Sequence, residues 1–302
     1  MEGALDILHR VAAATVTIEA DIPPNHPSVP VLGVQRYGTG AVVDDAGYIL
    51  SVHYVVLGAS RISVTDVSGN EYEAEIVAQD FATGIATLSI SAGALPALPR
   101  GDSRSLTPGR DVFTVSSVGG SERRSASGFV AAVDPFDAYW EYWLERALWV
   151  SYPNPGLGGA PVCSADGALC GLVSLNLGGV GRSTLAIPSE HYYDHVEELL
   201  RHGRRVSRDT RAWLGLFCYA TEERPVVAGL IPDGPGEAAG LTVGDIVMRI
   251  GEEAVENRAA LYHALWRSKP GETIALRVLR SGAETDVAVQ AGDAEEFFSI
   301  GE

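Results

Sequence analysis

Hydrophobic positions in the first two thirds of the chain occur in short runs that end at turn-forming residues. Between residues 11 and 188, runs of about four to eight apolar or alternating residues are followed by Gly, Pro, Asp or Asn. The clearest runs are ATVTIEA (14–20), GTGAVVDDAGYILSV (38–52), RISVTDV (61–67), EYEAEIVAQD (71–80), ATLSISA (86–92) and DVFTVSSV (111–118). Strands of this length and spacing are typical of a β-sandwich or a β-barrel. The sequences DDAG at 44–47 and SADG at 164–167 predict hairpin turns, because Asp and Gly tolerate the positive φ that such turns require.

One segment, DPFDAYWEYWLERALWV at 134–150, departs from this pattern. It interleaves aromatic and charged residues without clean alternation, and it holds three of the five tryptophans of the chain: Trp140, Trp143 and Trp149. Two interpretations stay open. The segment is either a long loop or helical turn packed on the barrel, or an exposed surface for a protein partner, since Trp and Tyr anchor interfaces.

The pattern changes again after residue 188. Residues 189–211 predict a helix with Ser189 as its N-cap and Gly203 at its end, followed by a linker. Residues 212–292 predict a second, smaller domain with strands and two helices, at 236–240 and at 257–268, the latter beginning with Asn257 as N-cap. An acidic tail, 293–302, completes the chain. The sequence therefore predicts a mainly β chain with a large domain at 1–188 and a small α+β domain at 212–292.

Composition and charge narrow the possible partners. The 302 residues are 46% hydrophobic and 20% charged, which is ordinary for a globular protein, and the formal net charge of −17 argues against binding to nucleic acid. No apolar run approaches the roughly 18–20 residues of a membrane span, so no integral membrane segment is expected. The N-terminus begins with an acidic residue, and His9 and Arg10 interrupt the apolar stretch that follows, unlike in a secretory signal. The compartment stays open: periplasmic or secreted if Met1 is not the natural start, and cytoplasmic if it is.

Cysteine and histidine spacing predicts no metal site and no cofactor. The chain has three cysteines, too few for a disulfide framework, and no Cys-x-x-Cys pair. Counting outward from the turn at Asp166 and Gly167 makes Cys163 and Cys170 a directly opposed pair of adjacent strands. We expect them to be free, buried thiols, with a cross-strand disulfide as the alternative.

Several sequence blocks, in order, resemble the HtrA-type serine proteases. These blocks are GTGAVVDDAGYIL, IVAQDFATGIATLSI, GDSRSLTPGRDVFTV, NPGLGGAPVCSADGALCGLVSL and, in the small domain, WLGLFC, PGEAAGLTVGDIVMRIGEEAV and KPGETIALRVLRSG. The resemblance covers roughly residues 8–292. It implies a trypsin-like double β-barrel followed by a PDZ domain.

The same resemblance indicates that the catalytic triad is degenerate. The family has a His where this chain has Tyr54 in SVHYVV, an Asp where it has Gly84 in GIATL, and a Ser where it has Gly158 in GLGGAP. Glycine has no side-chain atom that could attack a carbonyl, and a phenol with a pKa near 10 keeps its proton at pH 7. We interpret the adjacent His53 as a partly exposed packing residue. We therefore expect a pseudoprotease; the alternative is an active serine-type endopeptidase with a non-standard site.

Two binding functions survive this loss. The backbone N–H groups of Gly156 and Gly158 are expected to retain a residual oxyanion hole. In the PDZ domain, the resemblance implies that Trp213, Leu214, Gly215 and Leu216 form a loop whose N–H groups receive the C-terminal carboxylate of a peptide. The peptide would then add as a strand along residues 216–219. Leu261 and Leu265 would line the pocket for its last side chain, or would simply belong to the domain core.

The resemblance also suggests partners and a role. The family forms trimers through a region that corresponds to residues 31–40, so a homotrimer with Tyr37 as a contact is expected. Segment 134–150 corresponds to the family's sensor loop. We expect a protein that binds peptides or protein C-termini as an adaptor, chaperone or regulator in protein quality control.

Overall fold

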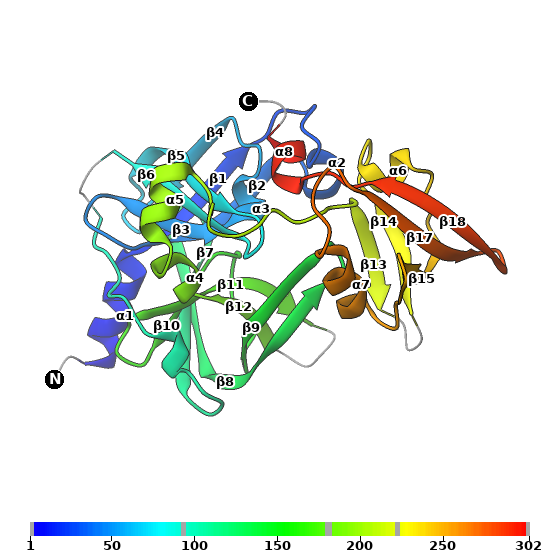
Figure 1. Ribbon diagram of the computed structural model, residues 1–302. Helices are drawn as coiled ribbons and strands as arrows, with labels where there is room; N and C mark the ends of the chain where they lie inside the picture. The colour runs from blue at the N-terminus through cyan, green and yellow to red at the C-terminus, as the bar shows by residue number, and fades with distance from the viewer. Residues whose placement is uncertain (1–2, 92–94, 179–182, 221–223, 300–302) are drawn as a thin grey trace. The chain divides into compact units, whose positions relative to one another are not determined.

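The computed structural model describes residues 3–91, 95–178, 183–220 and 224–299, which form two compact units (Figure 1). The first unit contains residues 1–135 and 145–206, and the second contains residues 136–144 and 207–302. The boundary after residue 206 falls inside the predicted linker. The assignment of residues 136–144 to the second unit is not anticipated by the sequence pattern.

The first unit contains two closed six-stranded barrels, as the mainly β prediction requires. The first barrel has the strand order β1-β2-β3-β6-β5-β4. Its strands are β1 (Thr15–Asp21), β2 (Gln35–Val42), β3 (Tyr48–Val52), β4 (Arg61–Thr65), β5 (Glu71–Asp80) and β6 (Ile85–Ile90). They coincide with the hydrophobic runs of the sequence, and the predicted turn at 44–47 joins β2 to β3. There Asp44 accepts hydrogen bonds from the N–H groups of Ala46 and Tyr48, and Gly47 has a φ of 91°.

The second barrel has the order β10-β11-β12-β9-β8-β7. Its strands are β7 (Asp111–Gly119), β8 (Glu122–Ala138), β9 (Tyr142–Val150), β10 (Pro161–Ser164), β11 (Leu169–Leu177) and β12 (Ser183–Pro188). Short helices accompany the barrels: α1 (Ala4–Ala13), α2 (Val29–Leu32), α3 (His53–Val56), η1 (Ser103–Ser105), α4 (Glu190–Tyr193) and α5 (Val196–His202).

Segment 134–150 is neither a loop nor a helical turn, so this interpretation is wrong. It contains the end of β8 and all of β9, which are paired and are joined by residues 139–141. Its outward positions carry aromatic side chains, and this hides the alternation that identifies a strand.

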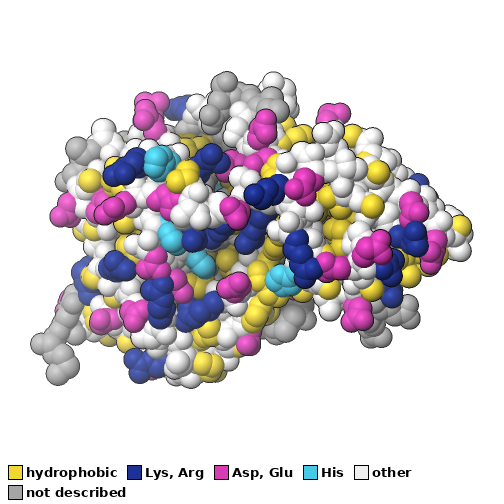
Figure 2. Space-filling model, viewed as in Figure 1, with side chains coloured by type: hydrophobic (Ala, Val, Ile, Leu, Met, Phe, Trp, Pro, Cys, Tyr) yellow, Lys and Arg dark blue, Asp and Glu magenta, His cyan; other side chains and the backbone are white. Residues whose placement is uncertain are grey.

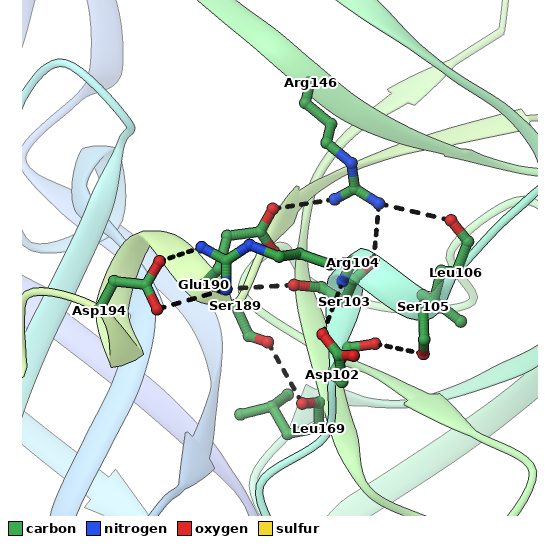
Figure 3. Close-up of polar contacts among 10 residues, drawn as sticks. All are labelled: Asp102, Ser103, Arg104, Ser105, Leu106, Arg146, Leu169, Ser189, Glu190 and Asp194. Atoms are coloured by element: carbon green, nitrogen blue, oxygen red, sulfur yellow. Dashed lines mark hydrogen bonds and ion pairs between the residues drawn. The ribbon is translucent and has the colours of Figure 1, made fainter.

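The predicted helix after Ser189 is divided into α4 and α5 around Asp194 and His195. Ser189 does not cap it through its side chain; the hydroxyl donates instead to the carbonyl of Leu169, at 3.3 Å (Figure 3). Gly203 ends α5 in the left-handed conformation, with a φ of 72°, as predicted.

Arginines fix α4 and η1 to each other and to β9 (Figure 3). Arg146 of β9 forms an ion pair with Glu190, at 2.9 Å, and donates to the carbonyl of Ser103, at 2.7 Å. Arg104 of η1 pairs with Asp194 at the end of α4. The beginning of β9 in the first unit is therefore anchored by charge-assisted hydrogen bonds.

The second unit contains one antiparallel sheet with the strand order β13-β14-β15-β17-β18, to which β16 adds beside β15. Its strands are β13 (Leu216–Ala220), β14 (Pro225–Leu230), β15 (Ile246–Ile250), β16 (Glu253–Ala254), β17 (Thr273–Arg280) and β18 (Ala283–Gln290). Its helices are α6 (Pro235–Ala238), α7 (Arg258–Leu265) and α8 (Ala294–Phe298). Asn257 caps α7 as predicted, because its side chain accepts from the N–H of Ala260 at 2.8 Å.

The acidic tail is partly helical. Asp293 caps α8 through the N–H groups of Glu295 and Glu296, and Phe297 packs on Trp213 with ring centroids 4.9 Å apart. Residues 300–302 of this tail lie outside the described residues.

The described surface mixes both signs of charge. On the face drawn in Figure 2, acidic and basic side chains are interspersed. Among the described residues, every helix is too short or too polar to cross a lipid bilayer.

Candidate functional site

The turn at residues 154–161, NPGLGGAP, is held by hydrogen bonds from both barrels. Asn154 donates to the carbonyls of Gly156 and Leu157, at 2.9 and 3.0 Å. The N–H of Thr39, in β2, donates to the carbonyl of Gly158 at 2.7 Å. Gly159 has a φ of 89°, which favours glycine, and its N–H donates to the carbonyl of Val173. The backbone of the turn is thus tightly fixed.

Gly158 and Tyr54 lie directly against each other. A Cβ added at Gly158 would lie well under 3.0 Å from the Tyr54 hydroxyl oxygen. That hydroxyl donates to the carbonyl of Ser174, at 3.0 Å, and burial raises the pKa of Tyr54 to about 12. The phenol is therefore neutral at physiological pH, and its hydroxyl occupies the space into which a side chain at position 158 would project.

Gly84, the third predicted triad position, lies beside the residue that precedes Tyr54. The N–H of His53 donates to the Gly84 carbonyl at 2.9 Å, and Gly84 has a φ of 78°. The structure therefore brings all three positions into one region of the first unit, from α3, the β5–β6 turn and the 154–161 turn.

His53 is half-buried next to Phe81, with ring centroids 5.3 Å apart. Burial lowers the pKa of His53 to about 4 and outweighs the Gly84 carbonyl and the Asp80 carboxylate, which raise it. Within the described residues, its Nδ1 atom makes no hydrogen bond. A neutral, weakly basic imidazole is poorly suited to activate a nucleophile.

Hydroxyl groups near the turn are engaged in structural hydrogen bonds. Ser51 donates to the carbonyl of Thr39, at 2.8 Å, and Thr39 donates to the carbonyl of Leu157, at 3.0 Å. Ser116 donates to the side chain of Asn154. These contacts hold the wall of the turn.

The predicted carboxylate-binding loop of the second unit does contact a carboxylate. The N–H groups of Leu214 and Leu216 donate to the two side-chain oxygens of Glu141, at 3.0 and 2.6 Å. Gly215 has a φ of 75°, and an added Cβ would touch the Trp213 ring at 3.3 Å, so glycine shapes the loop. Burial raises the pKa of Glu141 to about 7, although the N–H groups of Leu216, Leu214 and Gly215 lower it.

Trp213, at the start of the loop, packs its ring on Phe297 of α8. Leu261 and Leu265 of α7 are completely buried in the hydrophobic core of the second unit together with Leu214 and Leu216. The side chains of Leu261 and Leu265 thus stabilise the domain, and their contact with a bound peptide stays a prediction.

Residue patterns gave no indication of Glu141, Arg258 or Tyr262 as site residues. Arg258 forms an ion pair with Asp137 at 2.6 Å, and the Tyr262 hydroxyl donates to the carbonyl of Ala138 at 2.7 Å. Both partners lie more than a hundred residues away in sequence, so local spacing carries no signal. The one available clue was the unusual composition of segment 134–150.

Cys163, Cys170 and Cys218 are free and buried. The directly opposed arrangement of the first two is wrong: a bulge between Val162 and Cys163 places Cys163 opposite Leu169. Within the described residues, no group of three His, Cys, Asp or Glu side chains is arranged to hold a metal ion.

Comparisons with known families match both units. Residues 38–172 match the trypsin-like peptidase domain family, and residues 206–291 match the PDZ domain family.

Curated relatives align with most of this chain. A protein of Halomonas elongata named "Probable periplasmic serine endoprotease DegP-like" is 32% identical over 274 residues, which cover 85% of this chain and 56% of the relative. A protein of the same name from Marinomonas sp. is 29% identical over 270 residues, covering 83% and 56%. The chain thus spans a little over half the length of these relatives.

Solved structures share the fold over nearly the whole chain. "HtrA-type protease AlgW with decapeptide" is 24% identical with a TM-score of 0.57, and the match covers 97% of this chain and 99% of that one. The serine endoprotease from Yersinia pestis is 25% identical with a TM-score of 0.56, covering 97% and 98%. The predicted fold class is confirmed. The chain therefore has a trypsin-like peptidase domain followed by a PDZ domain, the arrangement of the HtrA/DegP-type proteins.

Proposed function

We propose that this protein is a peptide-binding pseudoprotease. Its PDZ domain binds the C-termini of peptides or proteins, and its trypsin-like domain does not cleave them. In this role it serves as an adaptor, chaperone or regulator in protein quality control.

The observation that carries the loss of catalysis is the contact between Tyr54 and Gly158. A triad needs a nucleophile, a base and a group that orients the base. Residue 158 offers only hydrogen, and the Tyr54 hydroxyl fills the adjacent space while it donates to Ser174. The proposal assigns the three degenerate triad positions to Tyr54, Gly84 and Gly158.

A weaker anion site is proposed at the same turn. The N–H groups of Gly156 and Gly158 would form a residual oxyanion hole for a carbonyl or carboxylate. Support comes from the rigid backbone of the turn, since Gly156 packs so closely on the carbonyl of Ser117 that no side chain fits there.

The observation that supports peptide binding is that the loop at residues 213–216 binds the carboxylate of Glu141. Two backbone N–H groups of this loop point at one carboxylate group in a buried site, which is the geometry needed for a peptide C-terminus. The edge strand β13 follows directly and can accept a peptide as an added strand.

Two activity assays test the catalytic half of the proposal. Incubation of the full chain with casein should give no cleavage products, and a fluorophosphonate probe should label no residue. The HtrA-type protease AlgW, whose solved structure is described as that of a protease, serves as a positive control. Casein turnover or a labelled serine would contradict the proposal and support an endopeptidase with a non-standard site.

A peptide display library with free C-termini tests the binding half. Retention should require the free carboxylate and should be lost in Gly215→Glu, which places a negative charge in the loop. Gly271→Glu is the matched control, because Gly271 has a similar φ of 84° but open space around it. If neither the full chain nor Glu141→Ala retains any peptide in a carboxylate-dependent way, the PDZ proposal is wrong.

Location and assembly complete the proposal. The curated relatives are named periplasmic proteins, which supports an extracytoplasmic location for this one; cell fractionation tests it. A homotrimer is supported by exposed apolar side chains around residues 31–37, where Val31, Val34 and Tyr37 are each more than 40% exposed.

A further inference from the structure

Residues 136–144, the internal segment, lie between strand β13 and helix α7, where the peptide groove of a PDZ domain is expected. They lie at the tip of the paired strands β8 and β9 and belong to the same compact unit as the PDZ domain. Hydrogen bonds join them to the edge strand β13 on one side and to helix α7 on the other. The segment therefore lies where a strand-adding peptide would bind.

The carboxylate of Glu141 is bound by the loop that would bind a peptide C-terminus. Its oxygens accept from the N–H groups of Leu214 and Leu216, at 3.0 and 2.6 Å. Glu141 itself has a φ of 57°, a left-handed conformation that is uncommon outside glycine. Such a conformation persists where surrounding contacts maintain it, and here it directs the side chain into the loop.

The backbone before Glu141 pairs with β13 as a ligand strand would. The N–H of Cys218 donates to the carbonyl of Tyr139 at 2.6 Å. The Tyr139 ring lies between Phe217 and Tyr219, with centroids 5.7 and 6.2 Å away. Counted from Glu141 as the terminal position, the bonded carbonyl and the aromatic ring both belong to the residue two places before the end.

Helix α7 holds the other side of the internal segment. The Tyr262 hydroxyl donates to the carbonyl of Ala138, and it accepts from the N–H of Glu141 at 3.0 Å. Arg258 forms its ion pair with Asp137 and also donates to that residue's carbonyl, at 2.8 Å. Asp137 lies four places before Glu141, so an acidic group at this position has a defined cationic partner.

We propose that the internal segment is a built-in ligand of the PDZ domain, with the Glu141 side chain in place of a C-terminal carboxylate. A protein C-terminus binds only when it displaces this segment. The best competitor has a free terminal carboxylate, an aromatic residue two places before the end and an acidic residue four places before it. The inference rests on the proposed PDZ function.

Occupancy by the internal segment weakens external binding by a predictable factor. If the groove is open for a fraction of the time, the apparent affinity for a peptide falls by that same fraction. A groove that is open about a tenth of the time binds about tenfold more weakly than an unobstructed one. Removal of the Glu141 carboxylate should therefore strengthen peptide binding, the opposite of what loss of an ordinary binding residue does.

The test uses the full chain and the labelled peptide Phe-Asp-Ala-Tyr-Trp-Leu with a free C-terminus. This probe copies residues 136–140 and ends in a leucine carboxylate. We expect Glu141→Ala to bind it at least about tenfold more tightly than the unaltered protein does, and the amidated peptide to bind neither. Glu145→Gln is the matched control, since Glu145 is an exposed carboxylate of β9 that lies four residues after Glu141 and outside the segment, and it should bind like the unaltered protein. Glu141→Gln preserves the side-chain volume and imitates the protonated acid, so it should bind the peptide more weakly than Glu141→Ala does.

Hydrogen exchange without any peptide tests the closed contact independently. The amides of Leu214, Leu216 and Cys218 donate to the internal segment, so they should exchange faster in Glu141→Ala than in the unaltered protein. Unchanged exchange, or equal peptide affinity in the unaltered protein and Glu141→Ala, would overturn the inference while leaving the PDZ function intact. Faster exchange with no peptide binding to any variant would overturn the PDZ function on which the inference rests.

A second peptide tests the preference for an acidic residue four places before the end. Phe-Asn-Ala-Tyr-Trp-Leu lacks the carboxylate that Asp137 presents to Arg258, so it should bind Glu141→Ala several-fold more weakly than the aspartate peptide. Equal affinities would overturn the acidic preference.

Discussion

The hydroxyl of Tyr54 lies directly against the backbone of Gly158 in the first unit. Their contact makes the two residues sterically dependent on each other, because any side chain at 158 must move a phenol that is hydrogen-bonded to Ser174. A similar dependence links Glu141 to Leu214 and Leu216, where a side-chain carboxylate satisfies two backbone donors. Substitutions at these positions test single contacts.

Gly158→Ser alone should fail to create a protease and should destabilise the first unit. The new Cβ would overlap the Tyr54 hydroxyl and break its bond to Ser174, which costs about 1–3 kcal/mol in the free energy of unfolding. In a unit of this size the melting temperature should fall by about 2–4 °C per kcal/mol, as measured by calorimetry.

Two further variants isolate the cause of this loss. Gly178→Ser makes the same change at a glycine with open space around it and should leave the melting temperature unchanged. Gly158→Ser combined with Tyr54→His should recover stability, because the shorter ring vacates the overlap. A full loss in the double variant would show that backbone strain, and not Tyr54, opposes a side chain at 158.

The Glu141 contact should weaken as pH rises towards neutrality. Burial raises the pKa of Glu141 from 4.5 to about 7 in the closed state, so the closed state favours the protonated acid. The resulting stability is complete below about pH 4.5 and is lost as pH rises through 7. The amide resonances of Leu214 and Leu216 should titrate with a midpoint near pH 7, and this titration should vanish in Glu141→Gln.

Two buried neighbours of Glu141 stay neutral in this range. Burial raises the pKa values of Cys218 on β13, to about 12, and of Tyr262 on α7. A midpoint near pH 4.5 would mean that Glu141 is solvated and that the contact is open.

Among single residues, the sequence indicates those that belong to contiguous motifs but not those that bind partners distant in the chain. The loop at Trp213–Leu216 is a contiguous motif, so the family resemblance proposes it as a carboxylate-binding loop. Glu141 could not be predicted, because its partners lie 73 and 75 residues away and a lone glutamate among aromatic residues has no recognisable spacing. His53 was predicted as a packing residue, but its depressed pKa depends on burial beside Phe81, which only the tertiary structure reveals.

Among elements, strands bounded by glycine and aspartate turns were the most predictable. The runs at 71–80 and 111–118 coincide with β5 and with β7, which extends one residue further. Strands β8 and β9 were missed at 134–150, where both faces carry large side chains. The helix after Ser189 was predicted as one element, whereas the Ser189 hydroxyl bonds to Leu169 and two short helices result.

Arg146→Met should loosen the contact of β9 with η1 and α4 seen in Figure 3. The change removes the ion pair with Glu190 and leaves the carbonyl of Ser103 without its charged donor. Half-buried groups of this kind cost about 1–3 kcal/mol when they lose their partner. Chemical denaturation of the full chain should report a decrease of that size in the unfolding transition of the first unit.

Arg124→Met provides the comparison for this prediction. Arg124 pairs with Glu122 on an exposed surface, with both side chains more than 60% exposed, so its loss should change stability by less than about 0.5 kcal/mol. If the two variants lose equal stability, the Arg146 cluster does not anchor β9.

For the whole molecule, the order of the two domains followed from the sequence blocks alone. The division into compact units did not, since residues 136–144 belong to the second unit although both flanking stretches belong to the first. Such an assignment depends on contacts between residues distant in sequence, which hydrophobic periodicity does not encode.

The proposed trimer gives a prediction at this scale. Sedimentation of the unaltered protein should report three times its mass of 31.9 kDa. A charge in the exposed apolar patch, in Val34→Asp combined with Tyr37→Asp, should shift the protein to a monomer. Val67→Asp, at another exposed valine, should not. A monomeric unaltered protein, or a trimer that survives the double substitution, would contradict the proposal.

Because the internal segment is covalently part of the receptor, its local concentration is the same in every molecule, whatever the abundance of the protein in the cell. A larger amount of the protein in the cell provides more binding sites, but the ligand concentration that half-occupies each site stays the same. That concentration depends on a few codons around position 141. Mutation there can change it while the loop at residues 213–216 is left unchanged.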